Sequence, residues 1–136
     1  MKKHEQHWNT VLNAYFREKK LHCYYELKAT KTDYLPFSKI EIHQYDGLQA
    51  TEKSGLVWKF SDEDQREKVC DGFSGPPLPS YIIIKFADGF YFIRIKDIVK
   101  MREDGEIAIT KGRAEEIAEK IIKLELKKKK NNEEEN

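Results

Sequence analysis

Two apolar segments near residue 90 constrain the fold of this chain more than any other feature. Residues 81–86 (YIIIKF) show almost no polar alternation, which is typical of a strand buried on both faces. Asp88-Gly89 is a hairpin-turn signal, and the apolar residues 90–95 follow it, so the two segments are expected to pair antiparallel. Such a sheet has to be covered by helices. The sequence therefore predicts an α/β fold, a mixed β-sheet flanked by helices.

Hydrophobic spacing predicts the elements before this hairpin. Apolar residues recur at helical spacing between residues 3 and 19, and residues 22–30 then read as a strand. Ser38 and Glu41 are expected to form a capping box that opens a second helix. That helix should run to about residue 50 and turn three apolar residues to the core: Ile42, Tyr45 and Leu48.

Further elements are predicted from residue 55 to the C-terminal end of the sequence. Residues 55–60 read as a strand and residues 68–73 as a short one. Thr110 is expected to cap a last helix whose apolar positions are Ala114, Ile117, Ala118, Ile121, Ile122 and Leu124. The length suits one domain, residues 1–126, followed by a charged disordered tail at 127–136.

Composition narrows the class of protein. There is no signal-like N-terminus and no apolar run long enough to span a bilayer, so we expect an intracellular, cytoplasmic protein without membrane contact. Cys23 and Cys70 lack metal-ligand spacing and read as core thiols. The net charge is only +1, yet residues 1–31 carry seven lysines and arginines against three glutamates. This basic surplus lies beside the strand at 22–30.

Glu26-Leu27-Lys28 carries the chemistry of that strand. Strand alternation puts Glu26 and Lys28 on one face, where a carboxylate can bind Mg²⁺ and an ammonium can act on a nucleophilic water or a phosphate. The Leu27 carbonyl could supply a further oxygen ligand. An ion pair with a purely structural role would have the same sequence pattern. Glu5 falls on the apolar side of the first helix, where it either caps the helix or joins the site.

The segments around this tripeptide resemble the PD-(D/E)xK nuclease superfamily, and more closely its Holliday-junction resolvases and their phage-type relatives. The resemblance covers about residues 5–95. It rests on the segments 25–30 (YELKAT), 35–38 (LPFS), His43-Gln44 with Leu48, 55–62 (GLVWKFSD), 70–73 (CDGF) and 81–86.

The resemblance implies a restriction-endonuclease-like fold and a magnesium-dependent endonuclease that cuts branched DNA such as four-way junctions in recombination and repair. Mn²⁺ would substitute for Mg²⁺, and a homodimer would cut two strands symmetrically. A phage-encoded origin is among its implications. Glu26 and Lys28 match the E-x-K motif, and Glu5 matches the acid that many resolvases carry on their first helix.

One departure from the family concerns the metal ligands. The family has an Asp before E-x-K, yet residues 1–25 contain none, so the missing ligand is Glu5, Glu18 or a later acid. Asp71 is the preferred later acid because it lies in the apolar sequence VCDGF, where an unpaired carboxylate would be costly. Asp62 is the second choice. The expected metal set is Glu26, Asp71 and Glu5.

Other polar residues are candidates for contact with DNA. Lys31 and Thr32, in the loop that leaves the E-x-K strand, are expected to contact phosphates. His43 could contact DNA, and Gln44 could hold a phosphate or orient the attacking water; both could equally be a structural pair on their helix.

Two other classes of function remain open. A non-catalytic nucleic-acid-binding module would explain the basic N-terminal third, with Glu26 and Lys28 as a structural pair. An accessory protein could pair with a partner through the hairpin of residues 81–95, which would then expose an apolar sheet edge. The sequence offers no Gly-rich phosphate loop and no nucleophilic serine motif.

Overall fold

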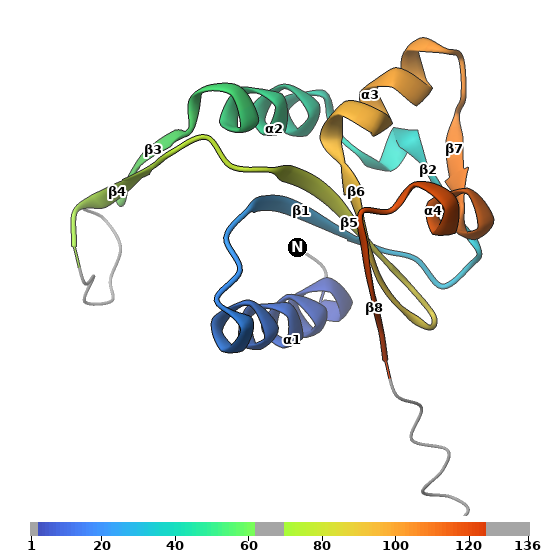
Figure 1. Ribbon diagram of the computed structural model, residues 1–136, viewed down its shortest axis with the longest axis horizontal. Coiled ribbons are helices and arrows are strands. Elements are labelled where there is room, and N and C mark those ends of the chain that lie inside the picture. Colours follow the sequence, from blue (N-terminus) through green and yellow to red (C-terminus); the bar gives the residue numbers. More distant parts are fainter. Residues whose placement is uncertain (1–2, 62–69, 125–136) are drawn as a thin grey trace, which may run out of the picture.

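A computed structural model describes residues 3–61 and 70–124, and in this part of the chain the fold is a mixed α/β arrangement (Figure 1). Its helices and strands, in chain order, are α1 (Lys3–Lys19), β1 (Tyr24–Ala29), β2 (Tyr34–Pro36), the 3₁₀ turn η1 (Phe37–Lys39), α2 (Ile42–Ser54), β3 (Leu56–Lys59), β4 (Gly72–Gly75), β5 (Ser80–Phe86), β6 (Gly89–Arg94), α3 (Ile95–Glu103), β7 (Ala108–Thr110), α4 (Lys111–Ile117) and β8 (Lys120–Lys123). The predicted disordered tail and Asp62 lie outside the described residues.

The main sheet has the strand order β1-β5-β6-β8, with β1 at one edge. Strand β1 runs parallel to β5, whereas β5, β6 and β8 pair antiparallel, so the sheet is mixed as predicted. The predicted hairpin is confirmed, but its turn is Ala87-Asp88, because Phe86 pairs with Gly89. Gly89 belongs to the ladder, where a β-carbon would collide with the β8 backbone at Ile122.

Helices cover both faces of this sheet, α1 on one face and α2 with α3 on the other (Figure 1). Alternate residues of β5 explain the two layers. Ile82 and Ile84 pack in the cluster that contains Tyr45 of α2, while Ile83 packs in the cluster that contains Leu12 of α1. All three isoleucines are fully buried, as expected for a strand covered on both faces.

The start of α2 differs from the prediction. The segment from Phe37 forms the turn η1, and the α-helix begins only at Ile42. Glu41 is the N-cap residue, and its capping-box partner is Gln44, not Ser38. Phe37 is buried, which ties down the turn at the position where the helix was expected to start. As a consequence Ile42 is 66% exposed, and its predicted core position is wrong, whereas Tyr45 is buried as predicted.

The C-terminal part also departs from the prediction. Thr110 caps a helix as expected, since its hydroxyl oxygen accepts the backbone N–H of Arg113. That helix ends at Ile117, and residues 120–123 form the strand β8 beside β6. Ile121 and Ile122 pair with the edge of β6 that would otherwise have no neighbouring strand. This long-range pairing, which suits β-branched residues, decides their structure although their spacing is helical. The helix α3 was not predicted.

Strands β3 and β4 form a separate two-stranded ribbon that projects from the body (Figure 1). Strand β3 was predicted, and β4 begins later than expected, at Gly72. Cys70 is exposed beside this ribbon, so its prediction as a core thiol is wrong. Cys23 is half-buried, and burial raises the pKa of its thiol to about 11.

The β5–β6 hairpin lies in the interior of the main sheet. Both strands lie inside the sheet, between β1 and β8, and their apolar residues are buried. The exposed apolar edge that an accessory protein would need is therefore not provided by this hairpin. No helix in residues 3–61 or 70–124 has the length and apolarity required to cross a membrane.

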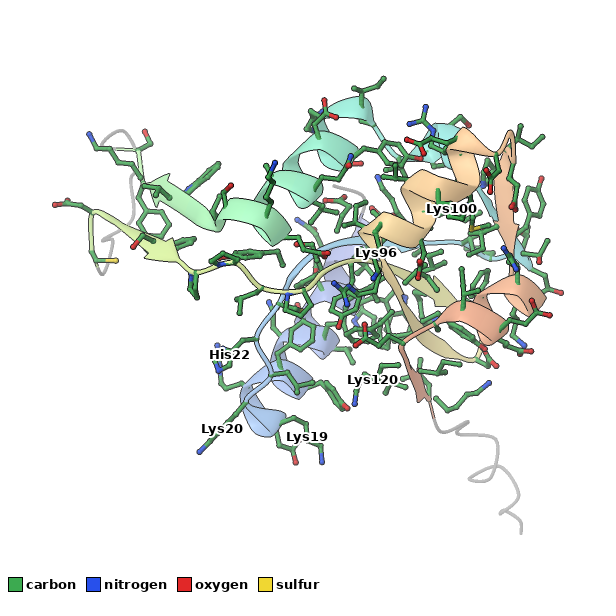
Figure 2. The ribbon with its side chains drawn as sticks, turned by 45° about the horizontal axis from the view of Figure 1, so that its top comes forward. Lys19, Lys20, His22, Lys96, Lys100 and Lys120 are labelled. Atoms are coloured by element: carbon green, nitrogen blue, oxygen red, sulfur yellow. The ribbon has the colours of Figure 1, made fainter. Side chains whose placement is uncertain are left out.

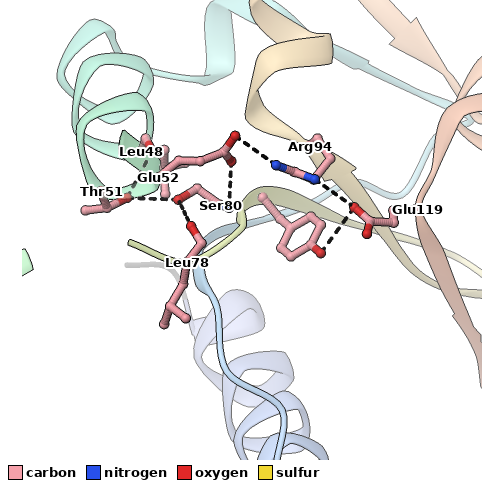
Figure 3. Close-up of polar contacts among 8 residues, drawn as sticks. Leu48, Thr51, Glu52, Leu78, Ser80, Arg94 and Glu119 are labelled. Atoms are coloured by element: carbon pink, nitrogen blue, oxygen red, sulfur yellow. Dashed lines mark hydrogen bonds and ion pairs between the residues drawn. The ribbon is translucent and has the colours of Figure 1, made fainter. Parts of the chain in front are cut away.

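A polar network fastens α2 to the beginning of β5 and to the segment before β8 (Figure 3). Glu52 accepts the backbone N–H of Ser80 at 2.9 Å and the guanidinium of Arg94 at 2.8 Å. Arg94 also reaches Glu119 at 3.4 Å, and Tyr81 donates its hydroxyl to the same carboxylate. Because β5 carries β1 in parallel register, this network holds the strand that presents E-x-K.

Candidate active site

Glu26 and Lys28 point from β1 to the face that α2 covers. Glu26 stands opposite Ile82 and Lys28 opposite Ile84, and both isoleucines belong to the core on that side. The Lys28 ammonium lies 3.6 Å from a Glu26 carboxylate oxygen. The side chains are 15% and 31% exposed respectively, so both charges are partly removed from water. The predicted juxtaposition is present.

The carboxyl group of Glu26 is not fully compensated by this contact. Burial raises its pKa above the ordinary value, and the nearby Glu5 carboxylate raises it further. Lys28 and, more weakly, His43 lower it, but the net direction is upward. A carboxylate that remains costly to ionise beside one ammonium favours a second cation near it.

Glu5 reaches the same strand from α1. One of its carboxylate oxygens accepts the backbone N–H of Ala29 at 3.1 Å. This N–H is free of the sheet because alternate residues of β1, Tyr24 and Thr30 among them, bond to β5 through Pro79 and Lys85. The same alternation turns the Leu27 carbonyl to the free edge. The edge of β1 thus gathers Glu5, the Leu27 carbonyl and, beside them, Glu26.

The structure does not bring the predicted third ligand to this edge. Asp71 is exposed next to β4, on the ribbon that projects away from β1 (Figure 1). Within residues 3–61 and 70–124, no three His, Cys, Asp or Glu side chains come together in a way that could hold a metal ion. Of the three predicted metal ligands, the structure places Glu26 and Glu5 at β1 and Asp71 elsewhere. Asp71 was chosen because an unpaired carboxylate among apolar residues would be costly, but its side chain is exposed to solvent.

Gln44 and His43 lie at the start of α2. The Gln44 side-chain oxygen accepts the backbone N–H of Glu41 at 2.9 Å, so Gln44 is committed to capping the helix through that atom. The His43 ring lies 3.3 Å from the Glu41 carboxylate and is largely exposed. His43 is close enough to influence Glu26 electrostatically, which keeps it at the border of the site.

A pocket of about 490 Å³ opens beside the E-x-K strand. It is lined by Glu5 and Lys28, by Lys31, which was predicted to contact phosphates, and by Lys39, which the sequence did not single out. Lys39 ends the turn η1, between the buried Phe37 and Ile40. In the sequence, Lys39 stands in a short segment between the apolar residues Phe37 and Ile40, and this pattern could have identified it.

Thr32 lies in the loop after β1, as predicted, and its hydroxyl is engaged within that loop. Its hydroxyl lies 2.9 Å from the Tyr34 carbonyl oxygen and 3.0 Å from the Thr30 hydroxyl. The Thr30 hydroxyl lies 3.2 Å from the same carbonyl. A hydroxyl has one proton to donate, and both protons have acceptors inside the loop. Thr32 therefore braces the loop that presents Lys31.

The assembled groups suit chemistry on a phosphate. Two carboxylates and a carbonyl at a strand edge can hold a hard cation, Lys28 stands next to them, and a lysine-lined pocket opens on the same side. Comparison of the chain with protein-family models and with curated proteins found no match.

Proposed function

We propose that this protein is a metal-dependent DNA endonuclease with a restriction-endonuclease-like fold that hydrolyses phosphodiester bonds at branched DNA. The observation that carries the proposal is the hydrogen bond from Ala29 to Glu5. It brings a second carboxylate to the free edge of the strand that bears Glu26 and Lys28. The mixed sheet with helices on both faces is consistent with the fold that this proposal requires.

The donor atoms fit Mg²⁺, with Mn²⁺ as a substitute. Magnesium prefers oxygen ligands and usually keeps several waters, so one or two carboxylates are sufficient protein ligands. Glu26 and Glu5 would hold it, and the Leu27 carbonyl faces the same edge. When bound, the ion supplies a polarised water and a positive charge against the phosphoryl oxygens.

Lys28 has two possible duties in the hydrolysis. Its ammonium can donate a hydrogen bond to the water that attacks phosphorus, or it can neutralise a phosphoryl oxygen as negative charge develops. The 3.6 Å contact with Glu26 keeps the ammonium at the strand face while its side chain is 15% exposed. Both duties require the same position, beside the carboxylate that holds the metal.

Cutting a four-way junction symmetrically requires two such sites. A closed two-fold dimer would place them on equivalent strands of the junction. We therefore include a homodimer in the proposal.

A second candidate function is a nucleic-acid-binding module without catalysis. Two observations favour it. Glu26 and Lys28 can compensate each other's charge, and the described residues bring only two carboxylates to the edge of β1. The lysine-lined pocket would serve binding equally well.

Cleavage of a labelled four-way DNA junction, compared with duplex of the same sequence, separates the two functions. We expect cleavage with Mg²⁺ and none with EDTA, and loss of cleavage in Glu26→Ala and in Lys28→Ala. Asp71→Ala serves as the matched control, since it removes a carboxylate outside the site and should cut as the native protein does. Binding without cleavage under every metal condition would leave the binding module as the function.

A further inference from the structure

The pocket beside the E-x-K strand carries lysines that have no part in the proposed work of Glu26 and Lys28. Three lysines line it, Lys28, Lys31 and Lys39, against one acid. That acid, Glu5, is already engaged by the Ala29 N–H. Lys28 is paired with Glu26, so the excess positive charge of the pocket comes from Lys31 and Lys39, which outnumber Glu5.

Both outer lysines are presented by segments that are already ordered. The loop carrying Lys31 is braced by the hydroxyls of Thr30 and Thr32 on the Tyr34 carbonyl. It is also held at its ends, where Thr30 donates its backbone N–H to Lys85 and Lys111 donates its own to Asp33. A braced loop loses little conformational freedom when a ligand binds.

Lys39 is fixed by the turn η1. The backbone N–H of Ile40 closes this turn on the Phe37 carbonyl at 3.0 Å, and Phe37 donates its own N–H to Ile107 at 2.9 Å. The buried side chains of Phe37 and Ile40 anchor the turn on both sides of Lys39. The ammonium of Lys39 is thus the exposed end of a firmly attached segment.

Part of the pocket wall is apolar. The partly exposed Pro36 and an edge of Leu35, which is only 2% exposed, line it together with the charged residues. Its volume of 490 Å³ lies within the range of about 300–1,000 Å³ that is typical of ligand sites. An apolar wall flanked by ammonium groups suits a sugar with its phosphate better than a free anion.

A second hollow, of about 510 Å³ between α2 and α3, provides a contrast. It also has three lysines, Lys96 among them, but they are opposed by Glu52 and Glu103. Lys96 and Lys100 extend from α3 (Figure 2). Lys96 therefore lines a hollow that contains no residue of the E-x-K strand, which makes it a matched control for Lys31 and Lys39.

We propose that the pocket lined by Lys31 and Lys39 is a subsite for one sugar-phosphate unit of the nucleic acid, next to the phosphate that is cut. Lys31 and Lys39 neutralise the phosphate, and the partly exposed Pro36 packs against the sugar. The inference rests on the proposed function for its substrate. It adds Lys39 as a binding residue without a part in the bond-breaking step.

The test is binding of a fluorescent four-way junction to the full-length protein in EDTA, over a series of salt concentrations. Each phosphate contact contributes about 0.9 to the slope of log affinity against log salt. We expect Lys31→Ala and Lys39→Ala each to weaken binding several-fold and to reduce the slope, by at most about 0.9 because the two lysines share one phosphate. Lys96→Ala, the matched control, should leave both unchanged, and Lys39→Arg should restore binding.

Cleavage measured with Mg²⁺ over a series of junction concentrations completes the test. Lys39→Ala should need a several-fold higher junction concentration to reach half of its maximal rate, whereas Lys96→Ala should show the native concentration dependence. A tetrathymidylate should compete with the junction, and inorganic phosphate at the same concentration should not.

The outcomes distinguish the subsite from the proposed function. If the native protein cuts the junction but Lys31→Ala and Lys39→Ala bind like Lys96→Ala, the subsite is overturned and the nuclease stands. If the native protein binds through these lysines but never cuts, the nuclease is overturned and the subsite stands. Equal competition by inorganic phosphate and tetrathymidylate would overturn the sugar contact, and absence of binding would overturn both proposals.

Discussion

Replacing Glu5 separates its structural duty from its proposed duty as a metal ligand. Its carboxylate accepts the Ala29 N–H at 3.1 Å in a half-buried position. A hydrogen bond to a charged group contributes about 1.5–3 kcal/mol, and partial exposure favours the lower end. Glu5→Ala should therefore reduce the free energy of unfolding by about 1.5 kcal/mol. Glu5→Gln keeps an oxygen acceptor for the same N–H and should lose less than about 1 kcal/mol.

The metal gives the second readout. At a Mg²⁺ concentration of 100 times Kd, one bound ion stabilises the folded state by about 2.7 kcal/mol. For a domain of this size that corresponds to a rise in Tm of roughly 10 °C. We expect this rise for the native protein and its loss in Glu5→Gln, although the metal-free stability of that variant is nearly native.

Thermal and urea unfolding with Mg²⁺ or EDTA measure both effects. The matched control is Glu18→Gln, which removes a carboxylate from the exposed side of the same helix and should keep the full Mg²⁺ response. A Glu5→Gln variant that is stabilised by Mg²⁺ as strongly as the native protein would refute Glu5 as a ligand. A native protein with no Mg²⁺ response would refute the metal site itself.

Three further predictions concern the charge of the site, the core and the polar network. Because the folded-state pKa of Glu26 is raised, its ionisation destabilises the metal-free protein as pH rises from the unfolded value through the folded one; Glu26→Gln should therefore be at least as stable as the native protein at pH 7 in urea with EDTA, and lower stability there would contradict it. Leu12→Ala removes a fully buried side chain and should cost about 2–5 kcal/mol by urea unfolding, whereas Leu21→Ala, at a 37% exposed position, should cost less than about 1 kcal/mol. Arg94→Ala leaves Glu52 without its 2.8 Å partner and should lower the unfolding free energy measured in urea by about 1–3 kcal/mol; a loss below about 0.5 kcal/mol, as for an ordinary surface substitution, would exclude the ion pair as a stabilising contact.

Local sequence signals predicted the elements whose stability depends on nearby residues. The apolar run before Gly89 gave a buried strand and a hairpin, and the spacing of apolar residues gave α1. The Thr110 cap was predicted for the same reason, since a cap bonds to a backbone group three residues away. The side-by-side placement of Glu26 and Lys28 follows from strand alternation alone.

Signals that depend on distant partners were misleading. Ile121 and Ile122 have helical spacing with Ala114, yet they pair with β6 as a strand because that edge needs a partner. Asp71 is surrounded by apolar residues along the chain, yet the ribbon to which it belongs carries it into solvent. The environment of a side chain is set by the residues that pack around it in the fold, and these are often distant in sequence.

The sequence by itself determined the E-x-K pair, the doubly buried hairpin and the first helix, because each depends on residue spacing within a single element. Only the tertiary structure decided that β1 is an edge strand, that Glu5 of α1 binds this edge, and that Lys39 shares a pocket with Lys31. These groups are separated by many residues along the chain. Their meeting depends on the order of strands in the sheet and on the packing of helices over it, and no local pattern encodes either.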